Sequence, residues 1–159
     1  MGSEMCIRDS FNADPISIWL ANQKTMDPKL APVIKMVGEE FDKIRPGVAI
    51  RSAHVGIGAS NTYVFMSDVL PRAIKKYGGV DPEALRKAAL DTDIPEGGTM
   101  LGFGVKFYGE GTPMAGQNER SFPVVIQYLD DKSHVVWPKS QAQREATLPA
   151  AAGSTYSNK

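Results

Sequence analysis

Residues 63–88 of this 159-residue chain read YVFMSDVLPRAIKKYGGVDPEALRKA and predict two helices in succession. The first helix is indicated by apolar side chains at helical spacing, namely Met66, Val69, Leu70, Ala73, Ile74 and Tyr77. Two glycines at 78–79 match the usual end of a helix. Asp-Pro at 81–82 starts the second helix, because the carboxylate can accept from the first free amides and proline suits the first helical position. An apolar stripe of this kind requires a core to cover it.

The residues just before this pair predict a loop that leads into the first helix. Residues 54–61 read HVGIGASN, whose two glycines favour a loop and whose Ser60 and Asn61 favour a helix start. Such a loop presents free backbone N–H groups that can receive a carboxylate. On the residues alone, an ordinary cap that serves only its own helix is the favoured alternative. Pro71 lies inside the helical pattern, and we expect a bend there because proline has no amide hydrogen to donate.

Another helix is predicted nearer the N-terminus, after Asp-Pro at 27–28. Its apolar side chains form one stripe, made of Leu30, Val33, Ile34, Val37, Phe41 and Ile44. Pro-Gly at 46–47 ends it. Short apolar runs on either side, at 16–20 and 48–50, predict strands or extended segments.

The second half of the chain predicts loops and strands. Glycines punctuate residues 91–123, which predicts a long loop with one short strand at 104–107. Two β-branched and aromatic runs follow at 124–129 and 134–137, and the short polar turn between them predicts a β-hairpin. The residues after Pro138 predict a peripheral or disordered tail. The chain is therefore of the α/β class, with more apolar helix surface than its own strands can cover.

Composition and charge exclude several classes of protein. The chain is 42% hydrophobic and 23% charged, which is typical of a globular domain. Eighteen basic and eighteen acidic side chains cancel, so nucleic acid and anionic lipid are not expected partners. No apolar run approaches the roughly 18 residues of a membrane-spanning helix, so we expect no direct membrane insertion.

The sequence offers no catalytic or metal-binding pattern. His54 and His134 are the two imidazoles, and neither has neighbours at metal-ligand spacing. No Gly-x-Ser-x-Gly elbow occurs, and the glycines at 56–58 lack the third glycine of a dinucleotide-binding loop. We therefore expect no enzymatic activity, no cofactor and no metal. Because His54 precedes the glycine loop, it is a candidate ligand contact.

Residues 1–10, MGSEMCIRDS, resemble translated linker sequence from the broken end of an assembled DNA fragment. We expect this leader, which carries the single cysteine, to be non-native and the authentic N-terminal residues to be missing. An expression scar or a short natural tail is the alternative.

The helix pair at 63–88 resembles the late helix pair of the type I periplasmic binding proteins that serve branched-chain and hydrophobic amino-acid ABC transporters. In that family an aromatic-started helix ends in "AI..yGg" and is followed by "DPEALRkAL". The later segments GVKF at 104–107, GQNER at 116–120 and the hairpin up to Pro138 resemble the closing part of the family pattern. The likeness runs from residue 16 to residue 149, in order and at matching spacing.

The resemblance implies a partial type I periplasmic-binding-protein fold. Family members are much longer and consist of two α/β lobes that close on a ligand. We expect residues 11–122 to form the C-terminal part of lobe I with the approach to the hinge, and residues 123–149 to form a terminal hairpin associated with lobe II. Residues 150–159 are expected to be a flexible tail.

The same resemblance implies a function. The chain would belong to the substrate-binding subunit of an ABC importer for branched-chain or other hydrophobic amino acids or related small solutes. Such a subunit is periplasmic, or extracellular and membrane-tethered, acts as a monomer when full length, and delivers its ligand to the permease subunits in the membrane. A ligand-sensing regulatory domain of the same fold is the alternative.

The family also indicates where ligand contacts would lie. Its members hold the carboxylate of the ligand with hydroxyls and backbone amides at helix starts, and the matching positions here are Ser60, Asn61, Thr62 and Tyr63. Pro71 and an apparent insertion at 110–115 depart from the commoner pattern, which leaves the identity of the ligand open.

Overall fold

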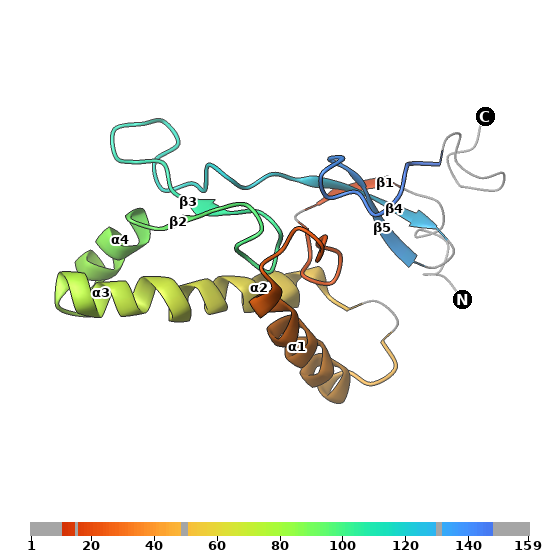
Figure 1. Ribbon diagram of the computed structural model, residues 1–159, viewed down its shortest axis with the longest axis horizontal. Helices are drawn as coiled ribbons and strands as arrows, with labels where there is room; N and C mark the ends of the chain where they lie inside the picture. Colours follow the sequence, from red (N-terminus) through yellow and green to blue (C-terminus); the bar gives the residue numbers. More distant parts are fainter. Residues whose placement is uncertain (1–10, 15, 49–50, 130–131, 148–159) are drawn as a thin grey trace, which may run out of the picture.

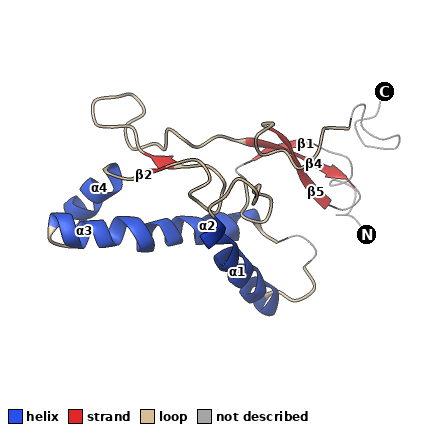
Figure 2. Cartoon of the chain, in the orientation of Figure 1, coloured by secondary structure: helices blue, strands red, loops and turns tan. Residues whose placement is uncertain are grey.

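The structure is a computed structural model that describes residues 11–14, 16–48, 51–129 and 132–147. Figure 1 shows the long helices at one end of the molecule and a three-stranded sheet at the other. Figure 2 shows how much of the chain between them is loop. The elements are β1 (Phe11–Asp14), the 3-10 helix η2 (Pro28–Leu30), α1 (Ala31–Ile44), α2 (Ala53–Val64), the π-helical segment η3 (Phe65–Val69), α3 (Leu70–Tyr77), α4 (Pro82–Leu90), β2 (Asp93–Ile94), β3 (Val105–Lys106), β4 (Val124–Leu129) and β5 (Lys132–Trp137). The leader at 1–10 and the tail at 150–159 lie outside the described residues.

The larger sheet has the strand order β1-β4-β5 and is antiparallel. The β4–β5 pair confirms the expected hairpin, although the turn at 130–131 lies outside the described residues. β4 buries Val124 and Ile126, and β5 buries Val135, so the hairpin contributes to the core. β1 pairs with the other edge of β4, with Phe11 opposite Gln127.

Residues 16–20 do not form the strand that their apolar pattern indicated. The amides of Leu20 and Ala21 donate to the carbonyl oxygen of Ser17 at 2.9 and 3.0 Å, which closes a turn. Ile16 and Ile18 are nevertheless fully buried, so the apolar run marks core packing and not strand pairing. Of the second expected strand, at 48–50, only the first residue is described, and it lies outside the strands.

Both Asp-Pro pairs start helices, as the sequence indicated. Asp27 Oδ1 accepts from the amide of Lys29 at 3.0 Å, in front of η2 and α1. Asp81 Oδ1 accepts from the amides of Glu83 and Ala84 at 3.1 Å, at the start of α4. Each carboxylate satisfies amides that have no partner within the helix, which stabilises these two helix starts.

The apolar stripe expected on α1 is buried at its start and bare at its end. Leu30 and Ile34 are buried, whereas Ile44 is 74% exposed. Between them, the ring of Phe41 packs against that of Trp19 at a centroid distance of 6.3 Å. The last turn of α1 therefore presents apolar surface to solvent.

The loop expected at 54–61 is a wrong prediction, because these residues lie within α2, which begins at Ala53. The two glycines had indicated a loop, but Gly56 is in the helix for a packing reason. A Cβ atom at that position would lie 2.9 Å from Ile18 Cγ1 and 3.3 Å from the indole nitrogen of Trp19. Glycine is thus required where α2 crosses the buried turn at 16–20.

The helix continues past Pro71 through a change of hydrogen-bond pattern. Residues 65–69 form the π-helical segment, in which the amide of Leu70 donates to the carbonyl oxygen of Phe65. Figure 1 shows α2, η3 and α3 as one long helix. A proline removes one amide donor, and the π-helical turn lies directly before it. As expected, the helix ends at Gly78, which has a φ of +79°.

A polar network holds α3 against α4. Arg72 Nη1 donates to the carbonyl oxygen of Ala88 at 2.8 Å and to Thr92 Oγ1 at 3.1 Å. Asp68 accepts from Arg72 Nη2 and, at 3.0 Å, from Thr92 Oγ1. Ala73 and Ala88 are fully buried beside this network, which allows the two helices to lie close together.

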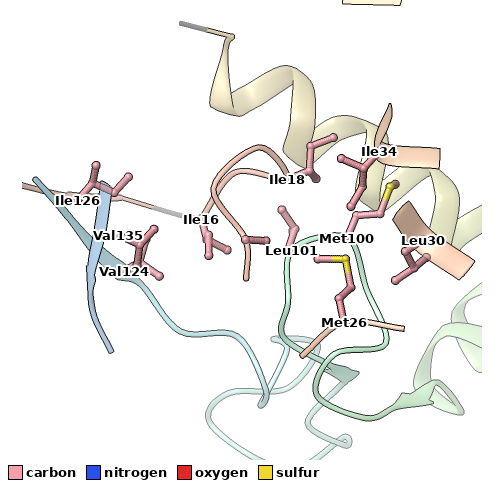
Figure 3. Packing of buried hydrophobic residues seen from close by; sticks show 11 residues of the cluster. Ile16, Ile18, Met26, Leu30, Ile34, Met100, Leu101, Val124, Ile126 and Val135 are labelled. Atoms are coloured by element: carbon pink, nitrogen blue, oxygen red, sulfur yellow. The ribbon is translucent and has the colours of Figure 1, made fainter. Parts of the chain in front are cut away.

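Most of the buried apolar side chains belong to one core cluster that joins distant parts of the chain. Figure 3 shows Ile16 and Ile18 from the turn, Leu30 from η2, Ile34 from α1, and Met100 and Leu101 from the glycine-rich segment. Val124, Ile126 and Val135 extend the cluster to the hairpin.

The long helix carries a second apolar surface that is not covered. Val69 and Ala73 face α4 and are buried. Met66 and Ile74 are 55% and 53% exposed, and Val55 near the start of the helix is also exposed. A helix that is apolar on more than one side is normally buried on more than one side. The described fold is therefore open on this side of α2 and α3.

Candidate functional site

An apolar cavity of about 640 Å³ lies beside α2. Its walls come from α2 and η3 on one side, from α4 on another, and from the segment 99–107 on the third. The side chains that face it are mainly aliphatic and aromatic, including Ile57, Val64, Leu85, Leu101, Phe103 and Phe107. Ligand sites in proteins have volumes of about 300–1,000 Å³ and mostly apolar walls with a few polar groups. The cavity has the size and lining of a site for a small apolar ligand.

Two of the five candidate contacts lie on this cavity. Ser60 and Asn61 both line it from α2. The structure does not bring Thr62, Tyr63 or His54 to it. Thr62 and His54 are exposed on other sides of α2, and Tyr63 packs against the core cluster.

The backbone geometry expected around Ser60 is wrong, since α2 starts well before that residue. Amides inside a helix already donate to carbonyl oxygens of the preceding turn. The segment 60–63 therefore does not offer the free N–H groups that were expected to hold a carboxylate. Any contact from these positions has to come from side chains.

Ser60 is the unusual polar group of the cavity. Its side chain is 1% exposed, and its Oγ atom has no hydrogen-bond partner within the described part of the protein. Leaving a buried hydroxyl without a partner costs about 1–3 kcal/mol. Ser60 lines the cavity, although its Oγ atom is itself covered, so a polar atom of a ligand would reach this hydroxyl only after a change of the Ser60 rotamer or of its neighbours.

The far wall of the cavity depends on Asn118, from the GQNER segment. Its Oδ1 atom accepts from the amides of Lys106 and Arg120 at 3.0 and 3.1 Å, and its Nδ2 atom donates to the carbonyl oxygen of Gly104 at 3.0 Å. The side chain thereby fixes the loop at 116–120 against β3. The Asn118 side chain thus connects the GQN segment directly to the GVKF segment at 104–107.

Gly104 and Arg120 lie next to this wall and support it from behind without lining the cavity. A Cβ atom on Gly104 would lie 2.2 Å from the carbonyl oxygen of Ile94 and 2.8 Å from Arg120 Cδ, so only glycine fits. Arg120 Nη1 donates to that same carbonyl at 2.5 Å, and Nη2 pairs with Asp93 at 2.6 Å. The antiparallel pairing of β2 with β3 is thus supplemented by contacts of Arg120 with Ile94 and Asp93, next to Gly104.

Charged groups occur at the rim of the cavity. Arg86 lines the rim and pairs with Glu83 and Glu110. The hydrogen bonds from Arg86 lower the pKa of the Glu83 carboxyl to about 2, and the same pairing raises the pKa of Arg86. All three side chains are largely exposed, so they contribute little to stability.

Sequence reasoning missed most of the apolar lining. Val69 belongs to the apolar pattern predicted for the first helix, and Leu85 lies in the second predicted helix, for which no apolar pattern was given. Phe103 and Leu101 come from the glycine-rich segment, where no periodicity marks the buried side chains. The joint occurrence of GVKF and GQN was the one signal that this segment folds back on itself.

The described residues contain no group of three or more His, Cys, Asp or Glu side chains placed to hold a metal ion. Among these residues there is also no helix with the length and apolar character needed to cross a membrane. The cavity itself combines apolar walls with hydroxyl and amide groups, which is an arrangement for binding.

Comparison with known proteins identifies distant homologues of the chain. No family model matches the sequence. The "Leu/Ile/Val-binding protein homolog 7" of Brucella suis biovar 1 (strain 1330) is 30% identical over 127 residues, which cover 80% of this chain and 29% of that protein. The chain is a distant homologue of that protein.

Proteins of the same name from two other Brucella species are also similar to this chain. The Leu/Ile/Val-binding protein homolog 7 of Brucella abortus (strain 2308) is 34% identical over 92 residues, 58% of this chain and 22% of that protein. The one from Brucella melitensis biotype 1 is 29% identical over 127 residues. The chain therefore spans less than a third of the curated relatives it matches.

This homology confirms the resemblance at the level of distant kinship with Leu/Ile/Val-binding protein homologs. The observed mixture of helices and small sheets is consistent with part of a periplasmic-binding-protein fold. The assignment of residues to lobes and the candidate contacts stay predictions.

Proposed function

We propose that this chain is part of the solute-binding subunit of an ABC importer for branched-chain or other hydrophobic amino acids or related small solutes. The observation that carries the proposal is its similarity to Leu/Ile/Val-binding protein homologs over 80% of its length. The subunit would act in the periplasm, or outside the cell on a membrane tether. It would function as a monomer without catalysis and release its ligand to permease subunits.

The open side of the fold supports this proposal. Met66 and Ile74 are exposed on a helix whose other side is already covered by α4. In a larger two-lobe protein, β-structure from the remaining chain would cover them. We assign residues 11–122 to the C-terminal part of lobe I and residues 123–149 to a hairpin associated with lobe II.

The cavity beside α2 supports a hydrophobic ligand. Its walls suit an aliphatic or aromatic side chain, and Ser60, whose covered hydroxyl has no partner among the described residues, and Asn61 are polar residues of its lining. We propose these two residues as ligand contacts. Thr62, Tyr63 and His54 stay predictions from the sequence.

A chimera tests the proposal. The aligned 127-residue segment of the Brucella suis relative is replaced by the matching segment of this chain, and the parent relative is studied in parallel. The chimera should melt cooperatively. It should also be stabilised by the hydrophobic amino acids that stabilise the parent, because a ligand that binds only the folded state raises its stability.

Two serine variants of the chimera test the site. Ser60→Ala should weaken ligand binding by up to about tenfold, the worth of one good hydrogen bond. Ser67→Ala is the matched control, since Ser67 is exposed on the same helix and its hydroxyl donates to the carbonyl oxygen of Tyr63 at 2.7 Å. Isothermal titration gives both affinities.

Two outcomes contradict the proposal at different points. A chimera that does not fold, beside a parent that melts sharply, refutes the placement in this fold. A chimera that folds and binds ligand equally well with Ser60→Ala and Ser67→Ala leaves the fold intact and refutes the assigned contact.

A further inference from the structure

The apolar cavity beside α2 separates two apolar clusters of the protein. On one side, Val69 and Leu85 belong to the small cluster between α3 and α4. On the other side, Leu101 and Phe103 belong to the larger core cluster. The position of α4 relative to the segment 99–107 therefore sets the width of the cavity.

The two sides are joined at one end of the cavity by the β2–β3 pair. The chain runs from α4 into β2, whose Ile94 is paired with Val105 of β3. Arg120 strengthens this end through its contacts with Ile94 and Asp93. At this end the backbone itself limits how far α4 can move away from the opposite wall.

A loop meets α4 at the rim of the same cavity. Residues 108–117 form this loop between Phe107 and Asn118, which line the cavity and face each other in a β-bridge. Figure 1 shows the loop beyond β3, at the end of the molecule that carries α4. Glu110 in the loop pairs with Arg86 on α4, which also lines the cavity. The pair thus connects the two sides of the cavity at its rim.

The loop is built as a unit that can move. The amide of Tyr108 donates to the carbonyl oxygen of Gln117 at 2.9 Å, and the amide of Gly116 donates to that of Tyr108 at 3.0 Å. These hydrogen bonds close the base of the loop. A Cβ atom on Gly109 or Gly111 would meet no atom within 4 Å, so the loop has open space around it there.

The ion pair at the rim is weak enough to open. Glu110 and Arg86 have side chains that are 72% and 46% exposed, and water and salt screen such a pair. Arg86 keeps a second partner when the pair opens, because its Nε and Nη2 atoms donate to Glu83 at 3.0 and 2.9 Å.

We propose that the Glu110–Arg86 pair is a strap across the rim of the cavity, and that its opening and closing control how fast a ligand enters and leaves. This control rests on the proposed function of the cavity. It is separate from closure of the two lobes, because the strap lies within the residues assigned to lobe I.

Binding kinetics of the chimera test the strap. The probe is L-leucine, and stopped-flow fluorescence gives its association and dissociation rates. Glu110→Gln should raise both rates by a similar factor of up to about fivefold, the worth of one exposed ion pair. Kd should stay nearly constant, because the strap is present with and without ligand. Loss of a direct ligand contact would instead raise mainly the dissociation rate.

Two further variants assign the effect to the pair. Glu119→Gln is the matched control, because Glu119 pairs with Lys106 at 3.4 Å on one side of the cavity and should leave both rates unchanged. Arg86→Gln combined with Glu110→Gln should accelerate exchange no more than Glu110→Gln does, as expected for residues that act as one pair. Salt at 1 M should accelerate exchange in the chimera and not in Glu110→Gln.

A measurement without ligand separates the strap from the proposed function. Spin labels on cysteines introduced at two exposed positions, Lys75 on α3 and Thr112 in the loop, report the distance between the helix pair and the loop in a chimera without other cysteines. The spread of this distance should widen with Glu110→Gln and not with Glu119→Gln.

The outcomes differ for the two proposals. If leucine does not bind and the spread widens as expected, the proposed function fails and the strap is supported. If leucine binds and Glu110→Gln changes neither the spread nor the rates, or changes the dissociation rate alone, the strap is refuted and the proposed function is not.

Discussion

Arg72 on α3 lies within hydrogen-bond distance of Ala88 on α4, with 2.8 Å between its Nη1 atom and the carbonyl oxygen. Ala88 is in the last turn of α4, where carbonyl oxygens have no partner inside the helix. The side chain of Arg72 on α3 therefore caps a free carbonyl oxygen at the C-terminus of α4. Arg72 also pairs with Asp68, so its loss would leave both an acceptor and a carboxylate poorly satisfied.

We predict that Arg72→Met lowers the free energy of unfolding by about 1–3 kcal/mol, the cost of leaving such groups unpaired. Urea unfolding of the chimera, followed by circular dichroism, measures this change. Lys75→Met is the control, because Lys75 is exposed on the same helix. A change within about 0.5 kcal/mol for both variants would show that the network contributes nothing.

Replacing Gly104 tests the contacts by which Asn118 and Arg120 support the segment behind the cavity wall. Gly104→Ala places a methyl group against the carbonyl oxygen of Ile94, and overpacking of this kind costs about 1–3 kcal/mol. We expect a lower melting temperature and weaker ligand binding by the chimera. Gly109→Ala, where a Cβ meets no atom within 4 Å, should leave both unchanged. Equal melting temperatures for the two variants would contradict the contact.

Asp91 should make the helix pair sensitive to acid. Lys76 Nζ and Tyr77 Oη each donate to Asp91 Oδ2 at 2.5 Å, and these hydrogen bonds lower the pKa of the Asp91 carboxyl. A carboxyl whose pKa is lower in the folded state stabilises the fold at pH values above its unfolded pKa, which is about 3.9 for Asp. That stabilisation is lost as the pH falls through the lower, folded pKa.

We expect Asp91→Asn to lower the melting temperature of the chimera at about pH 6, and the difference from the parent sequence to shrink as the pH falls below the unfolded pKa of Asp91, about 3.9. The effect should be small, because the pair is solvent-exposed and screened by salt. Glu96→Gln, at an exposed position outside the helix pair, is the control. If the difference in melting temperature between Asp91→Asn and the parent sequence grew as the pH fell, the assigned role of the Asp91 carboxylate would be contradicted.

The exposed apolar surface of the long helix should govern the behaviour of the chain on its own. Residues 11–159 expressed alone should aggregate and bind hydrophobic dyes. Met66→Lys combined with Ile74→Lys should raise solubility and leave helix content intact, since both side chains are exposed. Val69→Lys should abolish folding, because Val69 is buried against α4.

Size-exclusion chromatography and circular dichroism measure these effects. A monodisperse, cooperatively melting wild-type monomer would contradict the view that this surface needs further chain to cover it.

The sequence predicted those parts of the fold that depend on local chemistry. Asp81 and Gly78 mark real helix ends, because capping and left-handed backbone act within a few residues. The β4–β5 hairpin was predicted for the same reason. Elements that depend on contacts between residues distant in the sequence were not predicted.

Gly56 and Ser60 show why the site was only partly predictable. In the sequence Gly56 looks like part of a loop, yet its function is to let α2 approach Ile18, far away along the chain. The sequence favours a helix start at Ser60, but this residue lies within α2, where its hydroxyl is buried and has no partner among the described residues. Its position beside a cavity follows from tertiary packing that no short pattern encodes.

The π-helical segment at 65–69 sets the rotational phase between the two halves of the long helix. Each residue turns an α-helix by about 100°, so removing one residue here would rotate α3 against α2 by about that angle. Val69 and Ala73 would swing away from α4, or Ser60 would leave its cavity. A single-residue indel in this segment would thus uncouple the position of Ser60 on the cavity from the packing of α3 on α4, whereas most substitutions there would preserve both.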